Sequence, residues 1–134
     1  MSKSTWLCNK ILDHNTGRAA FAMPTAVYAA LCKVAPSKGS TGSTIQEVAY
    51  TGYARVQVPA SSLNAASGGA MTNSADIEWP EVLGGSDTAV AVALVNAPSG
   101  GDMLYYDSDV GSVAVSTSQT PPVIRAGALT LTED

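Results

Sequence analysis

Short apolar segments separated by turn-forming residues recur from Pro24 to the end of the sequence. Thr25–Val34 is apolar on both sides and lies between two prolines, as expected of a strand buried on both faces. In Tyr53–Pro59 apolar and polar side chains alternate, which is the period of a strand. About seven or eight such segments follow at regular spacing, a pattern typical of a β-sandwich or a β-barrel. The sequence therefore predicts a mainly β fold, by preference a β-sandwich, with a jelly-roll-like arrangement as one version of it.

The remaining strands are expected between clear turn signals. They are Asp76–Pro80, Thr88–Val95 and Met103–Tyr106 joined as a hairpin, Val113–Val115, Val123–Arg125 and Gly127–Thr132. In the strand at 88–95, Val90, Val92 and Leu94 are expected on one side. The stretch at 35–44 (APSKGSTGST) is predicted to be a flexible polar loop.

One short amphipathic helix is predicted before the strands, from Ser4 to about Asp13. Ser4 is a suitable N-cap, and apolar residues from Leu7 to Leu12 share one face. Gly17 can end the helix in a left-handed conformation. We therefore divide the chain into an N-terminal helical segment at 1–17 and a single β-sandwich domain at 18–134.

The chain is poor in charge for its apolar content. Hydrophobic residues make up 46% of its 134 residues and charged residues 13%, whereas ordinary domains carry roughly a quarter charged residues. Either part of the surface is covered by neighbouring proteins, since charge is depleted at interface cores, or the exposed faces use Ser and Thr instead. Composition alone leaves these two interpretations about equal.

Charge is also distributed unevenly along the sequence. Up to Arg55 there are six basic and two acidic residues, and from Val56 onward one basic and nine acidic residues. The net charge of −4 argues against a nucleic-acid binder that relies on positive charge. A basic front and an acidic back favour two hypotheses: head-to-tail pairing of copies, or docking of the front on an acidic protein.

Cys8 and Cys32 have no CxxC spacing and are predicted to be buried free thiols of a protein made in a reducing cytoplasm. The N-terminus lacks the apolar stretch of a signal peptide, and no run of about 18 apolar residues exists. We expect a protein that neither crosses a membrane nor is secreted by a signal peptide.

No residue pattern predicts catalysis, a cofactor or a metal site. His14 is the single histidine and is expected to be a surface or capping residue, and no serine lies in a GxSxG turn. The acidic group at Asp102, Asp107, Ser108 and Asp109 has the oxygen ligands that calcium prefers but not the spacing of an EF-hand, so solvated hairpin ends are favoured. We expect no enzyme activity.

Six segments, taken in order, resemble a family of small structural proteins of tailed bacteriophages, known as tail-fibre-like or capsid cement (decoration) proteins. The matching segments are Ser4–His14, Val27–Leu31, Gly52–Val56, Ser74–Pro80, Gly100–Tyr105 and Ala126–Leu131. Between Trp79 and Ala91 the family usually has a "WGxvth" stretch, and Glu81–Ala89 departs from it. The resemblance implies a virion component without catalytic residues and leaves its place on head or tail open.

The leading hypothesis is a capsid cement protein on the outside of the shell, bound to the major capsid protein and self-associated in a symmetric oligomer. The residues expected to dock are Trp6, Leu7, Lys10 and Ile11 of the helix and Lys38 of the polar loop. The alternatives are a tail or tail-fibre component, and a carbohydrate-binding β-sandwich that uses Trp6, Trp79, Tyr105 or Tyr106 for stacking. No nucleic acid or membrane is expected as a partner.

Overall fold

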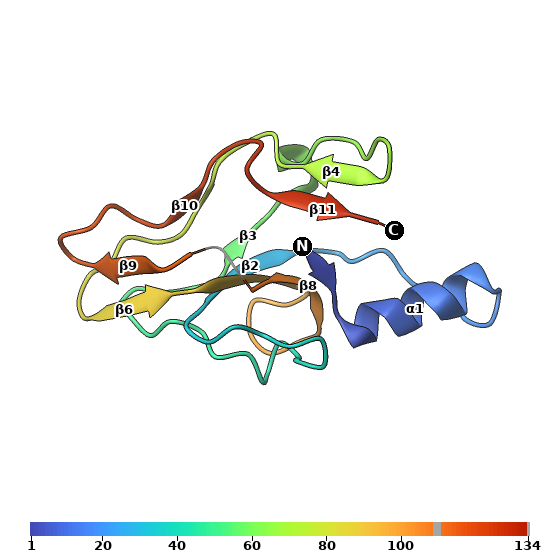
Figure 1. Ribbon diagram of the computed structural model, residues 1–134, viewed down its shortest axis with the longest axis horizontal. Helices are drawn as coiled ribbons and strands as arrows, with labels where there is room; N and C mark the ends of the chain where they lie inside the picture. The colour runs from blue at the N-terminus through green and yellow to red at the C-terminus, as the bar shows by residue number, and fades with distance from the viewer. Residues whose placement is uncertain (109–110, 134) are drawn as a thin grey trace.

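In the computed structural model, which describes residues 1–108 and 111–133, strands surround a core and one α-helix lies at the end of the molecule (Figure 1). The helix is α1 (Thr5–Asn15). The strands are β1 (Ser2–Lys3), β2 (Tyr28–Cys32), β3 (Val56–Gln57), β4 (Ala70–Thr72), β5 (Ile77–Glu78), β6 (Ser86–Ala89), β7 (Ala91–Val95), β8 (Met103–Asp107), β9 (Val113–Ser116), β10 (Val123–Ile124) and β11 (Thr130–Thr132). A 3-10 turn, η1 (Ala60–Ser62), precedes β4.

The centre of the fold is an antiparallel sheet in the order β1-β8-β7-β2-β3. Strand β2 lies between β7 and β3, with Tyr28 opposite Val95 and Cys32 opposite Ala91. This confirms the prediction of a strand buried on both faces, within shorter bounds than Thr25–Val34. The predicted hairpin is also confirmed, since β7 and β8 pair across the turn at 96–102.

The two faces of this sheet contribute to separate apolar clusters. Leu31, Val92 and Leu94 belong to the larger core, together with Trp79 and Leu129 from the segments above the sheet. Alanines and small side chains on the other face pack with Met103 in a smaller cluster. Because every residue of β7 is buried, the sheet has no solvent-exposed face at its centre.

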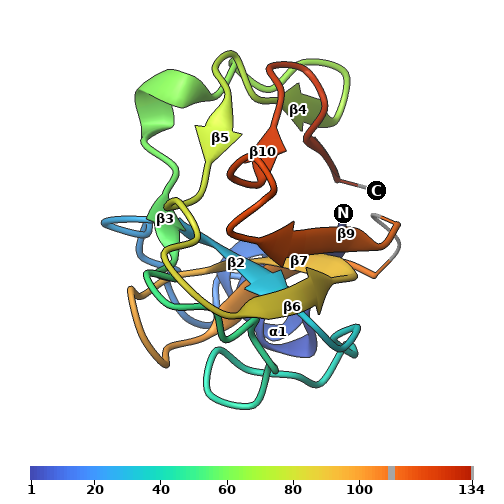
Figure 2. The same ribbon diagram turned by 90° about the vertical axis from the view of Figure 1, so that its left-hand side faces the viewer.

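Outside this sheet, the strands form separate two-stranded ribbons instead of a second continuous sheet. Figures 1 and 2 show β4, β10 and β11 above the sheet and the β6/β9 ribbon beside it. Within the described residues, β4 pairs with β11, β5 with β10 and β6 with β9, all antiparallel. The strands of these ribbons have two to four residues and lie next to glycine or proline turns. They offer few positions for backbone hydrogen bonds, so each strand pairs with one partner strand only. The mainly β fold is confirmed, whereas the closed sandwich and the jelly-roll topology are not.

The segment at 88–95 corrects the prediction of one continuous strand. The chain leaves the β6/β9 ribbon after Ala89 and enters the five-stranded sheet at Ala91. Between them, the amide of Val90 donates to the carbonyl of Cys32 (2.8 Å). Val90 packs with the smaller cluster, whereas Val92 belongs to the larger core. Apolar residues in unbroken succession hid this change of sheet.

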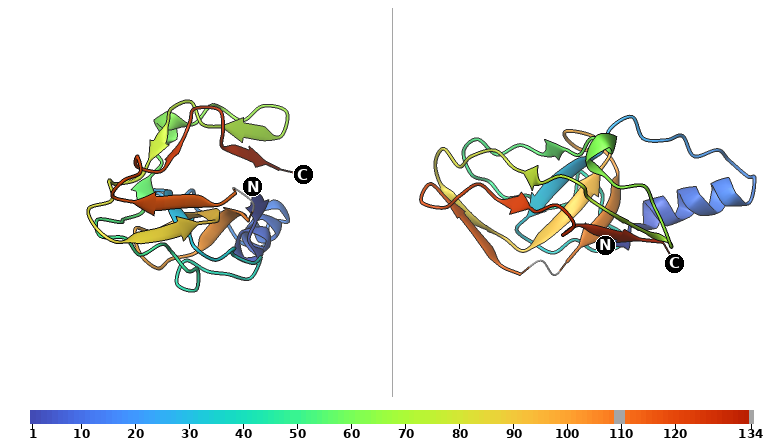
Figure 3. Two further views of the ribbon diagram at one scale, coloured as in Figure 1. Left: turned by 60° about the vertical axis from the view of Figure 1, so that its left-hand side comes forward. Right: turned by 90° about the horizontal axis from the view of Figure 1, so that it is seen from above.

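Helix α1 follows β1 and packs on β8. Figure 3 shows the helix extending away from the sheets, with the following segment returning along it. The predicted N-cap is confirmed because Ser4 Oγ accepts a hydrogen bond from the amide of Leu7 (3.1 Å). Gly17 has a φ of 76°, as predicted for the residue that ends the helix.

Candidate functional site

The beginning of helix α1 is fixed to the body by Ser4, which is fully buried. Its amide donates to the carbonyl of Leu104 (2.9 Å), and its hydroxyl donates to the carbonyl of Met103. The amide of Thr5 donates to the carbonyl of Lys38 (2.8 Å), so the polar loop touches the first turn of the helix. The two predicted docking elements, helix and loop, therefore lie side by side.

The predicted docking residues differ in how they are placed. Leu7 is 4% exposed and faces the chain's own body. Lys10 and Lys38 are exposed, whereas Trp6 and Ile11 are half-buried. The ammonium of Lys10 lies 5.6 Å from the ring centroid of Trp6, close enough for a cation–π contact. Of the predicted docking residues, Lys10, Lys38 and parts of Trp6 and Ile11 are therefore open to a partner.

The segment after the helix adds residues that the sequence analysis did not consider. Phe21 packs edge-on against Trp6 at 5.7 Å between ring centroids, and its amide donates to His14 Nδ1 (3.0 Å). His14 is exposed, as predicted. Met23 and Leu12 are 87% and 62% exposed. The sequence signal was available: Phe21 is the single phenylalanine, and it lies in an apolar run, Ala19–Met23, after the helix stop.

Between α1, β8 and the β4/β11 ribbon runs an apolar groove of about 350 Å³. Leu7 and Phe21 line it from the helix side, Leu104 from the sheet, and Met71 and Leu131 from the ribbon. Glu133 lies at its edge and forms an ion pair with Lys3. The groove separates the projecting helix from the upper ribbon.

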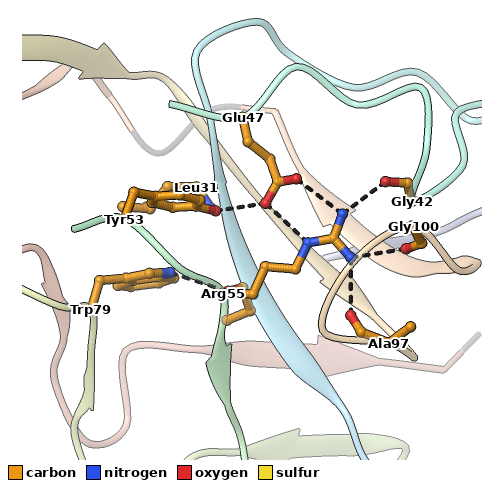
Figure 4. A network of polar contacts seen from close by, with 9 residues as sticks. Leu31, Gly42, Glu47, Tyr53, Arg55, Trp79, Ala97 and Gly100 are labelled. Atoms are coloured by element: carbon orange, nitrogen blue, oxygen red, sulfur yellow. Dashed lines mark hydrogen bonds and ion pairs between the residues drawn. The ribbon is translucent and has the colours of Figure 1, made fainter. Parts of the chain in front are cut away.

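A second candidate is the buried polar network around Arg55, whose side chain is 3% exposed (Figure 4). Its Nε and one terminal nitrogen donate to the two carboxylate oxygens of Glu47, each at 2.9 Å. The terminal nitrogens also donate to the carbonyls of Gly42 (2.7 Å), Ala97 (2.9 Å) and Gly100 (2.8 Å). A guanidinium has five N–H donors, and here each has an acceptor.

Tyr53 extends this network to the central sheet. Its hydroxyl donates to Glu47 (2.7 Å) and accepts from the amide of Leu31 in β2 (3.1 Å). Burial, and after it the hydrogen bond to Glu47, raises the pKa of Tyr53 well above its ordinary value. Burial, with Glu47 nearby, also raises the pKa of the Cys32 thiol to about 12. Both groups are held in their neutral forms at neutral pH.

The network therefore joins loops and does not present a free donor to a ligand. It connects β2, the loop at 42–47 and the hairpin turn at 97–100. These loops approach closely at Gly42, where an added Cβ would lie 2.0 Å from the carbonyl oxygen of Gly100. No prediction from the sequence included this network. No sequence signal indicated it, because Arg55 shares the polar side of an alternating segment with Gln57, where an exposed arginine is expected.

The other residues considered from the sequence occupy structural positions. Asp102 accepts from the side-chain amide of Asn96 (3.3 Å) at the hairpin end, whereas Asp109 lies outside the described residues. Within 1–108 and 111–133, no three His, Cys, Asp or Glu side chains are grouped as metal ligands. Trp79 is 2% exposed and donates from Nε1 to the carbonyl of Ala29 (3.1 Å), which confirms a core anchor and removes it as a stacking platform.

Both cysteines are free; Cys32 is buried and Cys8 half-buried. In the described part of the chain, no helix has the length and apolar character needed to cross a membrane.

Comparison with known proteins identifies one family. The model described as Podophage GP4 fiber I protein gp80 matches residues 2–132. No curated protein matches the sequence. The match spans β1, α1 and every following strand that the structure describes. The resemblance to structural proteins of tailed phages is confirmed.

Proposed function

The chain belongs to the Podophage GP4 fiber I protein gp80 family and is a phage structural protein, and we propose that it is a component of a tail fibre. The single observation that carries this proposal is the family match over residues 2–132. Because the match extends over the helix as well as the sheets, it concerns the entire domain and not a short shared motif.

The family match favours the tail-fibre alternative over the capsid cement hypothesis. The matching model is named for a fibre protein, and nothing in its name refers to a shell. Attachment to the major capsid protein and a place on the capsid surface remain predictions. A carbohydrate-binding role is weakened by the burial of Trp79.

The buried hydrogen-bond network of Arg55 supports a structural, non-enzymatic role. Arg55 holds three loop carbonyls and one carboxylate, so the loops on one face of the sheet are fixed to each other. Buried hydrogen bonds of charged groups are directional and costly to break. Such a network favours a scaffold that keeps its shape while its surfaces bind neighbours.

The experiment that tests the proposal is immunogold electron microscopy of the phage that encodes the chain, with antibodies raised against the purified protein. Label on fibres attached to the tail is expected. The control is a virion from which the gene has been deleted, which should lose both the label and the fibre. Label distributed over the capsid shell, with fibres intact in the deletion, would overturn the proposal and restore the cement hypothesis.

A further inference from the structure

The β4/β11 ribbon, which Figures 1 and 3 show above β1 and the beginning of α1, differs between its two ends. One end continues into Asn73 and Leu129, and we name it the base. The other continues into Gly69 and Glu133, and we name it the tip. At the base Asn73 is 1% and Leu129 5% exposed, whereas the Glu133 side chain at the tip is 49% exposed.

The base is fixed mainly by hydrogen bonds of Asn73. Its side chain accepts from the amide of Leu129 and donates to the carbonyls of Ala75 and Arg125. Its own carbonyl accepts from the amide of Gly127 (2.8 Å). All these partners belong to the ribbon or to the chain next to it, so the contacts of the base do not depend on those of the tip.

The tip is held to the five-stranded sheet through the carboxylate of Glu133. This group forms an ion pair with Lys3 of β1. Burial, and after it the charge of Glu133, raises the pKa of Tyr105 in β8, so the carboxylate lies close to both strands. Ion pairs of partly exposed groups contribute little to stability and are screened by salt. The tip is therefore attached more weakly than the base.

The space beneath the ribbon is the apolar groove of about 350 Å³. Met71 and Leu131 line it from the ribbon, and Leu7, Leu94 and Leu104 line it from the helix and the sheet. The last three side chains are each 4% exposed. Apolar side chains beside unfilled space lose packing contacts, so the ribbon gains less from packing at this place than a close-packed layer would.

We propose that the β4/β11 ribbon, with its turn at 64–69, is a lid that opens at the tip, pivots at the base and uncovers the apolar groove. The Lys3–Glu133 ion pair is the clasp that keeps the lid closed. The ribbon moves as one body, because the pairing of β4 with β11 and the hydrogen bond from the Glu133 amide to the Gly69 carbonyl (2.8 Å) lie within it. The five-stranded sheet remains folded, since its ladder does not include β4 or β11.

Hydrogen exchange of the purified chain, measured by mass spectrometry, tests the clasp. Glu133→Gln and Lys3→Met should each accelerate exchange in the lid about two- to fivefold, as expected for a partly exposed ion pair, and leave β7 unchanged. Salt at about 1 M should accelerate exchange in the lid of the wild-type chain but not further in Glu133→Gln, because it screens the same pair. The control is Asp13→Asn, which removes a carboxylate of similar exposure from the ion pair with Arg18, outside the lid.

Two further measurements distinguish a clasped lid from independent fraying. In the double variant Lys3→Met/Glu133→Gln the two effects should not add, because both substitutions break one contact. Nile red, an uncharged dye that fluoresces in apolar surroundings, should bind more strongly to the clasp variants than to the wild-type chain or Asp13→Asn, because the groove is uncovered more often.

The proposal is overturned if the clasp variants exchange like Asp13→Asn, if their effects add, or if their binding of Nile red equals that of the wild-type chain. Accelerated exchange in β7 would also overturn it, because ribbon and sheet would then open together. These outcomes leave the tail-fibre assignment untouched, since that assignment depends on the family match and not on the lid.

Discussion

The central sheet and the β4/β11 ribbon face the same apolar core but are held in different ways. Strand β7 has a hydrogen-bonded neighbour on each side and pairs with β2 at five positions. The β4/β11 ribbon has three paired positions and no further strand partner within the described residues. The ribbon depends instead on Asn73, whose side chain accepts from the amide of Leu129 (3.0 Å) and donates to the carbonyls of Ala75 (2.9 Å) and Arg125 (3.0 Å).

We name the five-stranded sheet with the Arg55 network the frame, and the two-stranded ribbons its attachments. In the sheet, stability is spread over ladder hydrogen bonds, burial on both faces and the Arg55 network, so we expect its amides to exchange only on global unfolding. In the ribbon, one buried side chain provides several of the contacts that hold the strands. Local opening of the ribbon without loss of the sheet is therefore expected.

The largest effect is expected from removing the buried charge of the frame. Arg55→Met leaves the half-buried Glu47 carboxylate and the carbonyls of Gly42, Ala97 and Gly100 without their donor. Removing one partner of a buried ion pair costs about 3–5 kcal/mol of the free energy of unfolding. Urea denaturation followed by far-UV circular dichroism measures this loss.

The matched control for that prediction is Arg125→Met, because the Arg125 side chain is 75% exposed in its pair with Asp76. Exposed pairs contribute about 0–1 kcal/mol. If Arg55→Met does not fold, Arg55→Lys, which keeps the charge but has fewer donors, provides the measurement. Equal losses in the Arg55 and Arg125 variants would contradict the distinction between frame and attachment.

The frame should also weaken at alkaline pH. In the unfolded chain a cysteine loses its proton at about pH 8.5 and a tyrosine at about pH 10, whereas folding raises the pKa of both Cys32 and Tyr53. Over this range the unfolded state binds fewer protons than the native state, so the free energy of unfolding falls as pH rises, by up to about 1.4 kcal/mol per pH unit per group. Urea midpoints from pH 8 to about pH 10 measure the slope, and Cys32→Ala should flatten it. An unchanged slope in Cys32→Ala would contradict the assignment.

A single substitution should destabilise the β4/β11 ribbon without destabilising the five-stranded sheet. Asn73→Ala leaves the amide of Leu129 and two carbonyls without their partners, which costs about 1–3 kcal/mol. Hydrogen exchange with mass spectrometry should show faster exchange at 70–73 and 129–133 with β7 unchanged. The control is Asn64→Ala, because Asn64 donates to Thr72 Oγ1 of the same ribbon from an exposed position (2.9 Å). Equal acceleration in β7 would show that the ribbon and the sheet unfold together.

The smallest effect is expected at acid pH and concerns the β5/β10 side. The amide of Ala126, and after it Arg125, lowers the pKa of Asp76. A lowered pKa in the native state stabilises the fold above the unfolded value of about 3.9, and this contribution disappears as pH falls through the native value. Since Asp76 is exposed, the loss should be slight. NMR titration of the Asp76 carboxyl carbon measures the pKa, and a value above about 3.9 would contradict the assignment.

The sequence predicted elements whose signals are local. The Ser4 N-cap and the Gly17 stop depend on neighbouring residues, and the buried strand at 28–32 follows from its own apolar run. The hairpin of β7 and β8 follows from the turn residues at 96–102. These elements need no knowledge of the partner segments.

Local sequence signals do not predict which distant segments of the chain contact each other. The four partners of Arg55 come from two other stretches of the chain, 42–47 and 97–100, and local periodicity contains no information on which carbonyls these stretches present. The sandwich topology was not confirmed for the same reason, since strand periodicity indicates strands but not whether short strands join a common sheet. The break at Val90 was hidden because both faces of β7 are apolar.

The most direct test of the account is electron cryo-microscopy of the virion that contains this chain. The account predicts density for the five-stranded sheet within a fibre attached to the tail. Density for the chain on the lattice of the capsid shell, with none in the fibres, would contradict it.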